Sequence, residues 1–179
     1  MKQLNLSFAQ PEKWRNERQT KKLNGEAWQI LRMKILENND YTCSYCGYKS
    51  DKYQIVDHID GNPENNTEIN LQVICQMCNL IKHSGQGCVI QGAVDLYRKS
   101  KYNQNTIIKI IRKMRDEGSR DDEIIEVLEL KEKVPFKMDI EYLKELFGFI
   151  SSRHTLKKDM YYNWLQYHSR TLKKPKQSS

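Results

Sequence analysis

The chain has 179 residues, a length that fits one compact domain or a small core with extensions. Thirty Lys and Arg against 23 Asp and Glu give a net charge of +7, which favours a polyanionic partner without identifying it. No apolar run is long enough to cross a bilayer, and residues 1–10 lack the apolar block of a signal peptide. We therefore expect a soluble, cytoplasmic protein with no membrane partner.

The N-terminal part of the chain changes character near residue 25. Residues 1–25 carry six basic and two acidic side chains and few periodic apolar positions, which predicts a basic arm that is either partly ordered or disordered. From Glu26 onward, apolar residues recur at spacings of three and four, which predicts an amphipathic helix. The run Asn38-Asn39-Asp40 ends that helix.

Residues 41–92 combine cysteine pairs with short strands. The run 53–59 has alternating character and predicts a strand, residues 60–63 are a strong turn signal, and residues 71–74 predict a second strand. Residues 75–83 can form a short helix that the Ser-Gly-Gln-Gly run at 84–87 stops. We take 26–92 as one core.

The region 93–169 is predicted to be mainly helical. Its expected helical segments are the stretch beginning near Val94, the isoleucine-rich run 107–114 closed by Gly118, residues 121–130, residues 138–150 and an aromatic segment at 160–167. The pair around Gly118 invites comparison with a helix-turn-helix, but the acidic residues of 121–129 would repel a DNA backbone. A packing role or a homodimer through these helices is at least as good an interpretation. Residues 170–179 form a purely basic tail.

Four cysteines carry the strongest local signal. Cys43 and Cys46 form one Cys-x-x-Cys pair and Cys75 and Cys78 a second, the ligand set expected of a structural Zn²⁺ site. The 28 residues from 47 to 74 exceed the spacing of a plain zinc ribbon, so a folded insert must lie between the pairs. Buried thiols without metal are the alternative. Cys88 is interpreted as a packed apolar residue rather than a fifth ligand.

Polar residues lie beside this zinc frame. Asp57 and His58 fall in the first strand, and Asn79 directly follows the last cysteine. On a helix, Asn79 and His83 share a face, so Asp57, Asn79 and His83 could converge on a hard divalent ion such as Mg²⁺ or Mn²⁺. His58 points to the opposite side of an ideal strand from Asp57 and needs a kink or bulge to act at the same phosphate.

The order of these motifs is more specific than any one of them. A Trp-x-x-Leu-Arg helix is followed by Cys-Ser-Tyr-Cys-Gly at 43–47, Ile-Val-Asp-His-Ile at 55–59, Asn-Leu-Gln-Val at 70–73 and Cys-x-x-Cys-Asn-x-x-Lys at 75–82. Across residues 26–84 this order resembles the HNH (ββα-metal) endonuclease family. The resemblance implies an α+β fold with a zinc-stapled ββα-metal core.

The resemblance also implies roles for individual residues. His58 would be the general base, Asn70 would brace the loop that orients it, and Asp57 and Asn79 would bind the catalytic ion. Because Asn79 stands where the family name has a histidine, the chain looks like the Asp-His-Asn variant, which uses Mg²⁺. His83 matches the place of an additional metal ligand in nuclease colicins.

The expected function is therefore a metal-dependent endonuclease that hydrolyses DNA, double-stranded DNA being favoured, in a restriction or homing role. Arg32 and Lys82 are candidate phosphate contacts. Two alternatives stay open: a non-catalytic zinc-ribbon module that binds nucleic acid, and an HNH nuclease that cleaves RNA.

Overall fold

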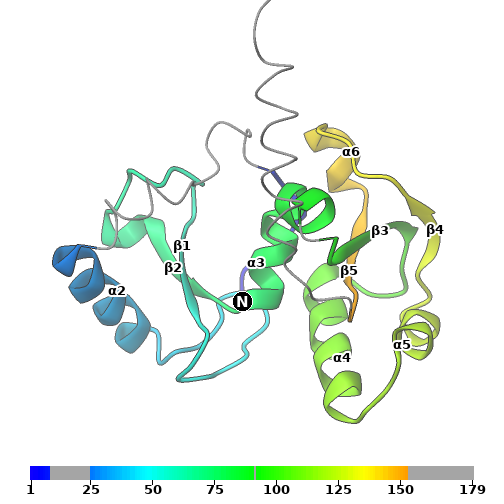
Figure 1. Cartoon of the computed structure of the whole chain (residues 1–179), viewed down its shortest axis with the longest axis horizontal. Helices are drawn as coiled ribbons and strands as arrows, with labels where there is room; N and C mark the ends of the chain where they lie inside the picture. The colour runs from blue at the N-terminus through cyan, green and yellow to red at the C-terminus, as the bar shows by residue number, and fades with distance from the viewer. Residues whose placement is uncertain (9–24, 91, 153–179) are drawn as a thin grey trace, which may run out of the picture.

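The computed structural model describes residues 1–8, 25–90 and 92–152 (Figure 1). Most of the expected basic arm, the aromatic segment 160–167 and the basic tail 170–179 lie outside these residues. Within them, no helix has both the length and the apolar character needed to cross a membrane.

The first part of the fold is a hairpin between two helices. Strands β1 (Ile55–His58) and β2 (Leu71–Ile74) pair antiparallel, and α2 (Glu26–Asn38) and α3 (Gln76–Lys82) lie on either side (Figure 1). Buried apolar residues join α2 to the hairpin: Ile35, Leu36, Val56, Leu71 and Val73. A short 3₁₀ turn, η2 (Glu68–Asn70), leads into β2. This arrangement confirms the predicted α+β fold with a ββα core, and the helix and strand bounds agree closely with the sequence periodicity.

The second part is a three-stranded antiparallel sheet with helices packed around it. Its strands run in the order β4 (Lys131–Val134), β3 (Val94–Lys99), β5 (Phe147–Ile150). The helices are α4 (Gln104–Asp116), α5 (Asp121–Val127) and α6 (Ile140–Lys144), and a π-helical turn, η3 (Gln86–Ile90), precedes the sheet. Gly118, with φ +86°, follows α4 as expected.

Two segments that the sequence analysis assigned to helices are strands. Residues 94–99 form the central strand β3 and residues 147–150 form β5, the two pairing from Val94 with Ile150 to Tyr97 with Phe147. Short apolar runs fit a buried strand as well as a buried helix, and periodicity alone does not separate them. The long-range partner decides the structure here, so the region after Gly92 mixes helix and sheet.

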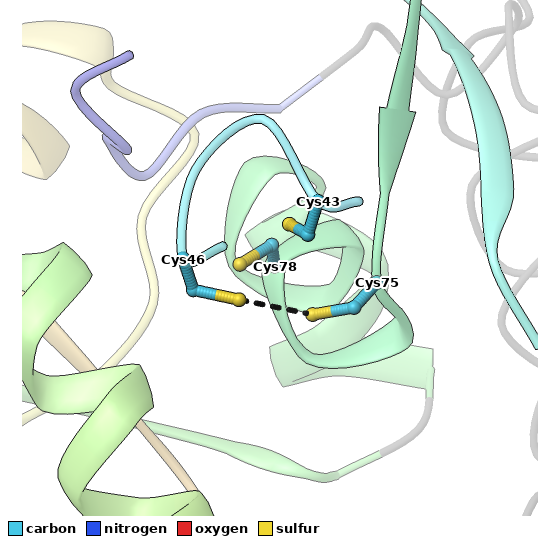
Figure 2. A group of neighbouring side chains, drawn as sticks. All are labelled: Cys43, Cys46, Cys75 and Cys78. Carbon is cyan, nitrogen blue, oxygen red and sulfur yellow. Dashed lines mark hydrogen bonds between the residues drawn. The ribbon is translucent and has the colours of Figure 1, made fainter. Parts of the chain in front are cut away.

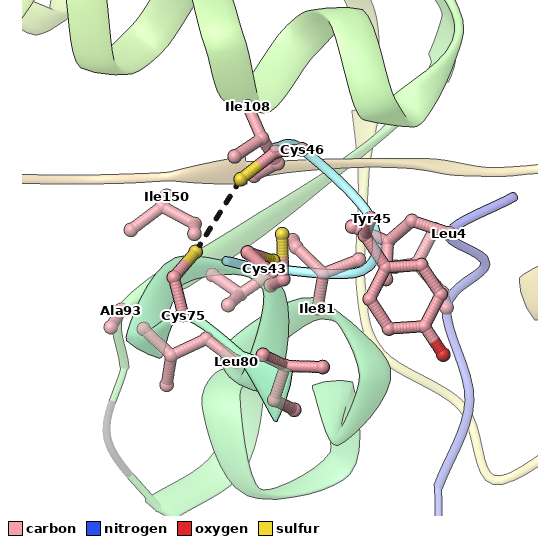
Figure 3. Packing of buried hydrophobic residues seen from close by; sticks show 14 of the residues in the cluster. Leu4, Cys43, Tyr45, Cys46, Cys75, Leu80, Ile81, Ala93, Ile108 and Ile150 are labelled. Carbon is pink, nitrogen blue, oxygen red and sulfur yellow. Dashed lines mark hydrogen bonds between the residues drawn. The ribbon is translucent and has the colours of Figure 1, made fainter. Parts of the chain in front are cut away.

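One hydrophobic core joins the two parts. Its buried cluster includes all four paired cysteines. Ile81 of α3, Ile108 of α4 and Ile150 of β5 belong to the same cluster (Figure 3). A Cβ on Gly148 would lie 2.6 Å from Ile81 Cδ1, so α3 approaches β5 closely because residue 148 has no side chain. This cluster crosses the boundary expected at residue 92, whereas a second buried cluster, which includes Ile111, Ile124 and Phe149, lies within residues 97–149.

The first eight residues belong to this core and are not a free arm. Leu4 and Leu6 are 1% and 2% exposed, the Leu4 N–H donates to Asn105 Oδ1 at 2.8 Å, and the Ser84 N–H donates to the Ser7 carbonyl at 2.9 Å. Leu4 and Leu6 are isolated leucines and give no periodic signal. The hydrogen-bond partner of Leu4, Asn105, lies 101 residues away in sequence. The pattern of residues 1–8 alone therefore does not reveal that this segment is part of the core.

Candidate metal and catalytic site

The four cysteines of the two Cys-x-x-Cys pairs meet at the start of α3 (Figure 2). Their Sγ atoms all lie within 4.8 Å of one another, and every one of the four residues is buried. Cys46 Sγ and Cys75 Sγ are 3.7 Å apart. With a Zn–S bond of about 2.3 Å, the edge of a tetrahedral thiolate site is about 3.8 Å. The four cysteines therefore have the geometry to hold a zinc ion, as the sequence predicts.

The charge around the sulfurs also favours a bound metal ion. Arg112 Nη2 donates to Cys75 Sγ at 3.2 Å, which stabilises a thiolate. Hydrogen bonds from the other three sulfurs lower the pKa of Cys43, whereas the Cys43 sulfur chiefly raises the pKa of Cys78. Four sulfurs this close cannot all ionise without a cation among them, so the donor set suits a divalent metal. Cys88 lies apart, and burial raises its pKa to about 12.

Asp57 is a buried carboxylate, 7% exposed, on the side of β1 that faces α3. Its Oδ2 accepts from Lys82 Nζ at 2.5 Å and from Gln72 Nε2 at 2.9 Å, and its Oδ1 lies 3.1 Å from His83 Nε2. Although burial opposes ionisation, the hydrogen bond with His83 and the charge of Lys82 hold the pKa of Asp57 below its usual range. The carboxylate is ionised and already has a cation beside it.

His58 is equally buried, at 6% exposed, but faces α2. Its ring is stacked on Trp28, with centroids 5.9 Å apart and planes 10° from parallel. Its Nε2 lies 2.9 Å from Asn66 Oδ1, and since an amide oxygen only accepts, this contact fits the ring tautomer that carries its proton on Nε2. The pairing of β1 with β2 advances one residue at a time without a bulge, so His58 and Asp57 point to opposite sides of the strand.

Asn70 ties together the loop that follows His58. Its Nδ2 donates to Asp60 Oδ1 and to the Asn65 carbonyl, both at 2.9 Å, and its Oδ1 accepts from the Asp60 N–H at 3.1 Å. Hydrogen bonds from the Asn62 N–H and from the side-chain amides of Asn70 and Asn65 lower the pKa of Asp60 to about 2. The same loop carries Asn66, so the contacts of Asn70 help to position the hydrogen-bond partner of His58.

The remaining predicted site residues, Asn79, Arg32 and Lys82, do not all converge on Asp57 and His58. Asn79 is half-buried on α3, and no hydrogen bond between described residues joins its side chain to Asp57 or His58. Arg32 donates to the Gln54 carbonyl at 3.0 Å, and Lys82 donates to Asp57 and, at 2.5 Å, to the His58 carbonyl. Both basic side chains, expected as phosphate contacts, are thus engaged within the protein.

A polar network behind Asp57 was not anticipated. Gln72, paired with Asp57 across the hairpin, also donates to Tyr45 Oη at 3.0 Å and accepts from Lys2 Nζ at 3.0 Å. Gln72 is a polar residue in an otherwise apolar four-residue strand, and this contrast could have identified it. Lys2 gave no comparable signal, because only folding brings residue 2 to β2.

Comparison with known proteins agrees with this geometry. Residues 43–85 match the HNH endonuclease family, so this segment is an HNH-type domain that contains the cysteine cluster. The type 4 apparatus protein DotN of Legionella pneumophila is 34% identical over 53 residues, which cover 30% of this chain. The match spans 25% of the length of DotN.

Proposed function

We propose, from the HNH endonuclease match of residues 43–85, that this protein is a metal-dependent nuclease that hydrolyses phosphodiester bonds in DNA. The observation that carries the proposal is the pair Asp57 and His58, whose side chains lie on opposite sides of β1, so β1 would have to bend locally for both to act at one phosphate. Both are buried at consecutive positions of β1, each in a defined hydrogen-bonding environment, beside a frame that four cysteines can fix with zinc. A domain that only needs a zinc frame for binding has no need of a buried carboxylate and imidazole at its edge.

His58 is the proposed general base. Phosphodiester hydrolysis needs a water molecule that loses its proton while it attacks in line with the leaving oxygen, and histidine is the side chain most often used for that transfer. Trp28 fixes the plane of the ring and Asn66 holds the proton on Nε2, which leaves Nδ1 to accept the proton of the water. Asn70 supports this arrangement through the loop that carries Asn66.

The proposed catalytic ion is Mg²⁺ or Mn²⁺. Asp57 fits such an ion because its carboxylate is ionised and an ammonium group, Lys82 Nζ, already occupies a cation position against it. Asp57 and Asn79 would hold the ion, with His83 as a third ligand, and Lys82 would move aside. When bound, the ion would neutralise charge that grows on the phosphate and leaving oxygen.

A second candidate function is a non-catalytic nucleic-acid-binding or assembly module. The saturation of Asp57 by Lys82, Gln72 and His83 favours it, since this carboxylate is satisfied without a metal. The name of DotN describes a component of an apparatus, and an equivalent role here would need no cleavage. Cleavage of RNA, dimerisation through the C-terminal helices and a cytoplasmic location stay predictions.

The test is a cleavage assay on supercoiled plasmid with Mg²⁺ or Mn²⁺. We expect the wild type to cut, and we expect His58→Ala and Asp57→Ala to lose at least a hundredfold in rate while they retain zinc. Asp51→Ala, which removes an exposed carboxylate near β1, is the matched control and should cut like the wild type. Equal cutting by wild type and His58→Ala would contradict the nuclease assignment. No cutting by any of them, with zinc bound, would favour the module.

A further inference from the structure

A second polar region of the molecule lies beside the cysteine cluster, away from Asp57 and His58. A hollow of about 390 Å³ opens between the loop at residues 46–48 and α4. A smaller hollow of about 150 Å³ shares Tyr48 and Arg112 with it and reaches Lys52 and Tyr53. We call the two hollows together the knuckle groove. Ile108 of α4 lies next to Cys46, which shows how closely α4 approaches this loop (Figure 3).

The groove is lined by three basic residues on one face of α4 and, at one end, by the acidic residues Asp116 and Glu117. Lys109, Arg112 and Lys113 occupy positions i, i+3 and i+4 of α4, so they project on the same side. Lys109 is exposed and has no ion-pair partner among residues 1–8, 25–90 and 92–152. Lys113 lies 4.0 Å from Glu117, at the acidic end of the larger hollow. Lys52 extends the positive lining at the other end.

Aromatic rings lie among these charges. The Arg112 guanidinium lies 3.6 Å from the centroid of the Tyr48 ring and also donates to Cys75 Sγ, so the middle of the groove is held in place by the cysteine cluster. Tyr53 is 85% exposed, and its backbone takes a left-handed conformation with φ +63°. The Tyr53 ring is therefore free of the core and accessible from solvent.

The knuckle groove and the Asp57 site lie at opposite ends of α3. Gln76, the first residue of α3, lines the smaller hollow, whereas Lys82, the last, contacts Asp57. Seven helical residues at 1.5 Å each separate the two by about 10 Å. The groove is therefore not part of the candidate catalytic site.

We infer that the knuckle groove binds single-stranded nucleic acid. Its lysines would contact backbone phosphates, and the exposed Tyr53 ring would stack on a base. A cationic track interleaved with aromatic rings is the combination that binds single strands with little sequence preference. An acidic peptide would match the lysines but would leave the exposed ring without a planar partner. This inference goes beyond the proposed nuclease function and does not require cleavage.

The experiment measures fluorescence anisotropy of a labelled 20-nucleotide oligothymidylate with the full-length protein, without added divalent ions. We expect Lys109→Glu/Lys113→Glu to raise the Kd at least tenfold and to flatten its salt dependence. The matched control is Lys131→Glu/Lys137→Glu, which changes the net charge equally at exposed positions away from the groove and should change the Kd less than threefold. Tyr53→Ala should raise the Kd at least fivefold.

The outcomes are separable. An equal loss of affinity in both charge-reversed proteins would mean general attraction to a basic surface and would overturn the inference. Tighter binding of a duplex of the same length, or of a polyglutamate peptide, would also overturn it. Zinc content, measured for every variant, identifies any protein whose cysteine frame has been damaged. The assay contains no divalent ion and measures binding alone, so a failure of the nuclease proposal leaves this result readable.

Discussion

Lys82→Met tests the ion pair at the centre of the candidate site. Lys82 and Asp57 are 12% and 7% exposed at the side chain, and their charged atoms are 2.5 Å apart. Methionine keeps the apolar stem but leaves the carboxylate without its cation, which costs about 3 to 5 kcal/mol for a buried pair. Gln72 and His83 still contact the carboxylate, so we expect about 3 kcal/mol, or a urea midpoint lower by about 1.5 M.

The assay is urea unfolding at pH 7 of Lys82→Met, Asp57→Asn and the double variant. Because folding lowers the pKa of Asp57, its stabilising contribution is complete above the unfolded value of about 3.9 and is lost as the pH falls through the folded value. At pH 7 the carboxylate is therefore fully ionised in both states. The double variant should be less destabilised than the sum of the single variants by about 2 kcal/mol.

A matched control separates this pair from ordinary surface charge. Lys34→Met removes an ion pair with Glu68 whose side chains are 53% and 49% exposed, and it should change stability by less than about 0.5 kcal/mol. Additive single and double variants, or a cost of Lys82→Met below about 1 kcal/mol, would refute the reasoning. A rise in the stability of Lys82→Met on addition of Mg²⁺, larger than that of the wild type, would support the ion as the replacement for the ammonium.

Three further predictions follow from the fold and the site. Zinc chelation or Cys78→Ser should abolish cooperative unfolding by circular dichroism, since zinc contributes about 10 to 16 kcal/mol at such sites; a sharp transition in zinc-free protein would contradict this. Gly148→Ala should cost about 1 to 3 kcal/mol through the clash with Ile81 Cδ1, and adding Ile81→Val, which removes that atom, should reduce the cost. Trp28→Leu should slow plasmid cleavage about tenfold with zinc retained, because His58 loses its stacking partner; an unchanged rate would contradict that role.

The local parts of the fold were predictable from the sequence because they depend on nearby residues. The spacing of Cys43, Cys46, Cys75 and Cys78 predicts the metal cluster, and strand alternation predicts that Asp57 and His58 face opposite sides of β1. The sequence could not show that Lys82 would reach Asp57 from α3. That contact depends on how the helix lies against the hairpin.

The four-cysteine cluster, the hairpin and the helices beside it follow from the amino-acid sequence, because ligand spacing and periodicity are local properties. Long-range packing places Leu4 in the core, makes residues 94–99 a central strand and brings Lys2 into contact with Gln72. Each of these depends on partners distant in sequence, whose contacts form when the chain buries its apolar surface. The same burial brings the charges of α4 beside the cysteine cluster, where the knuckle groove forms.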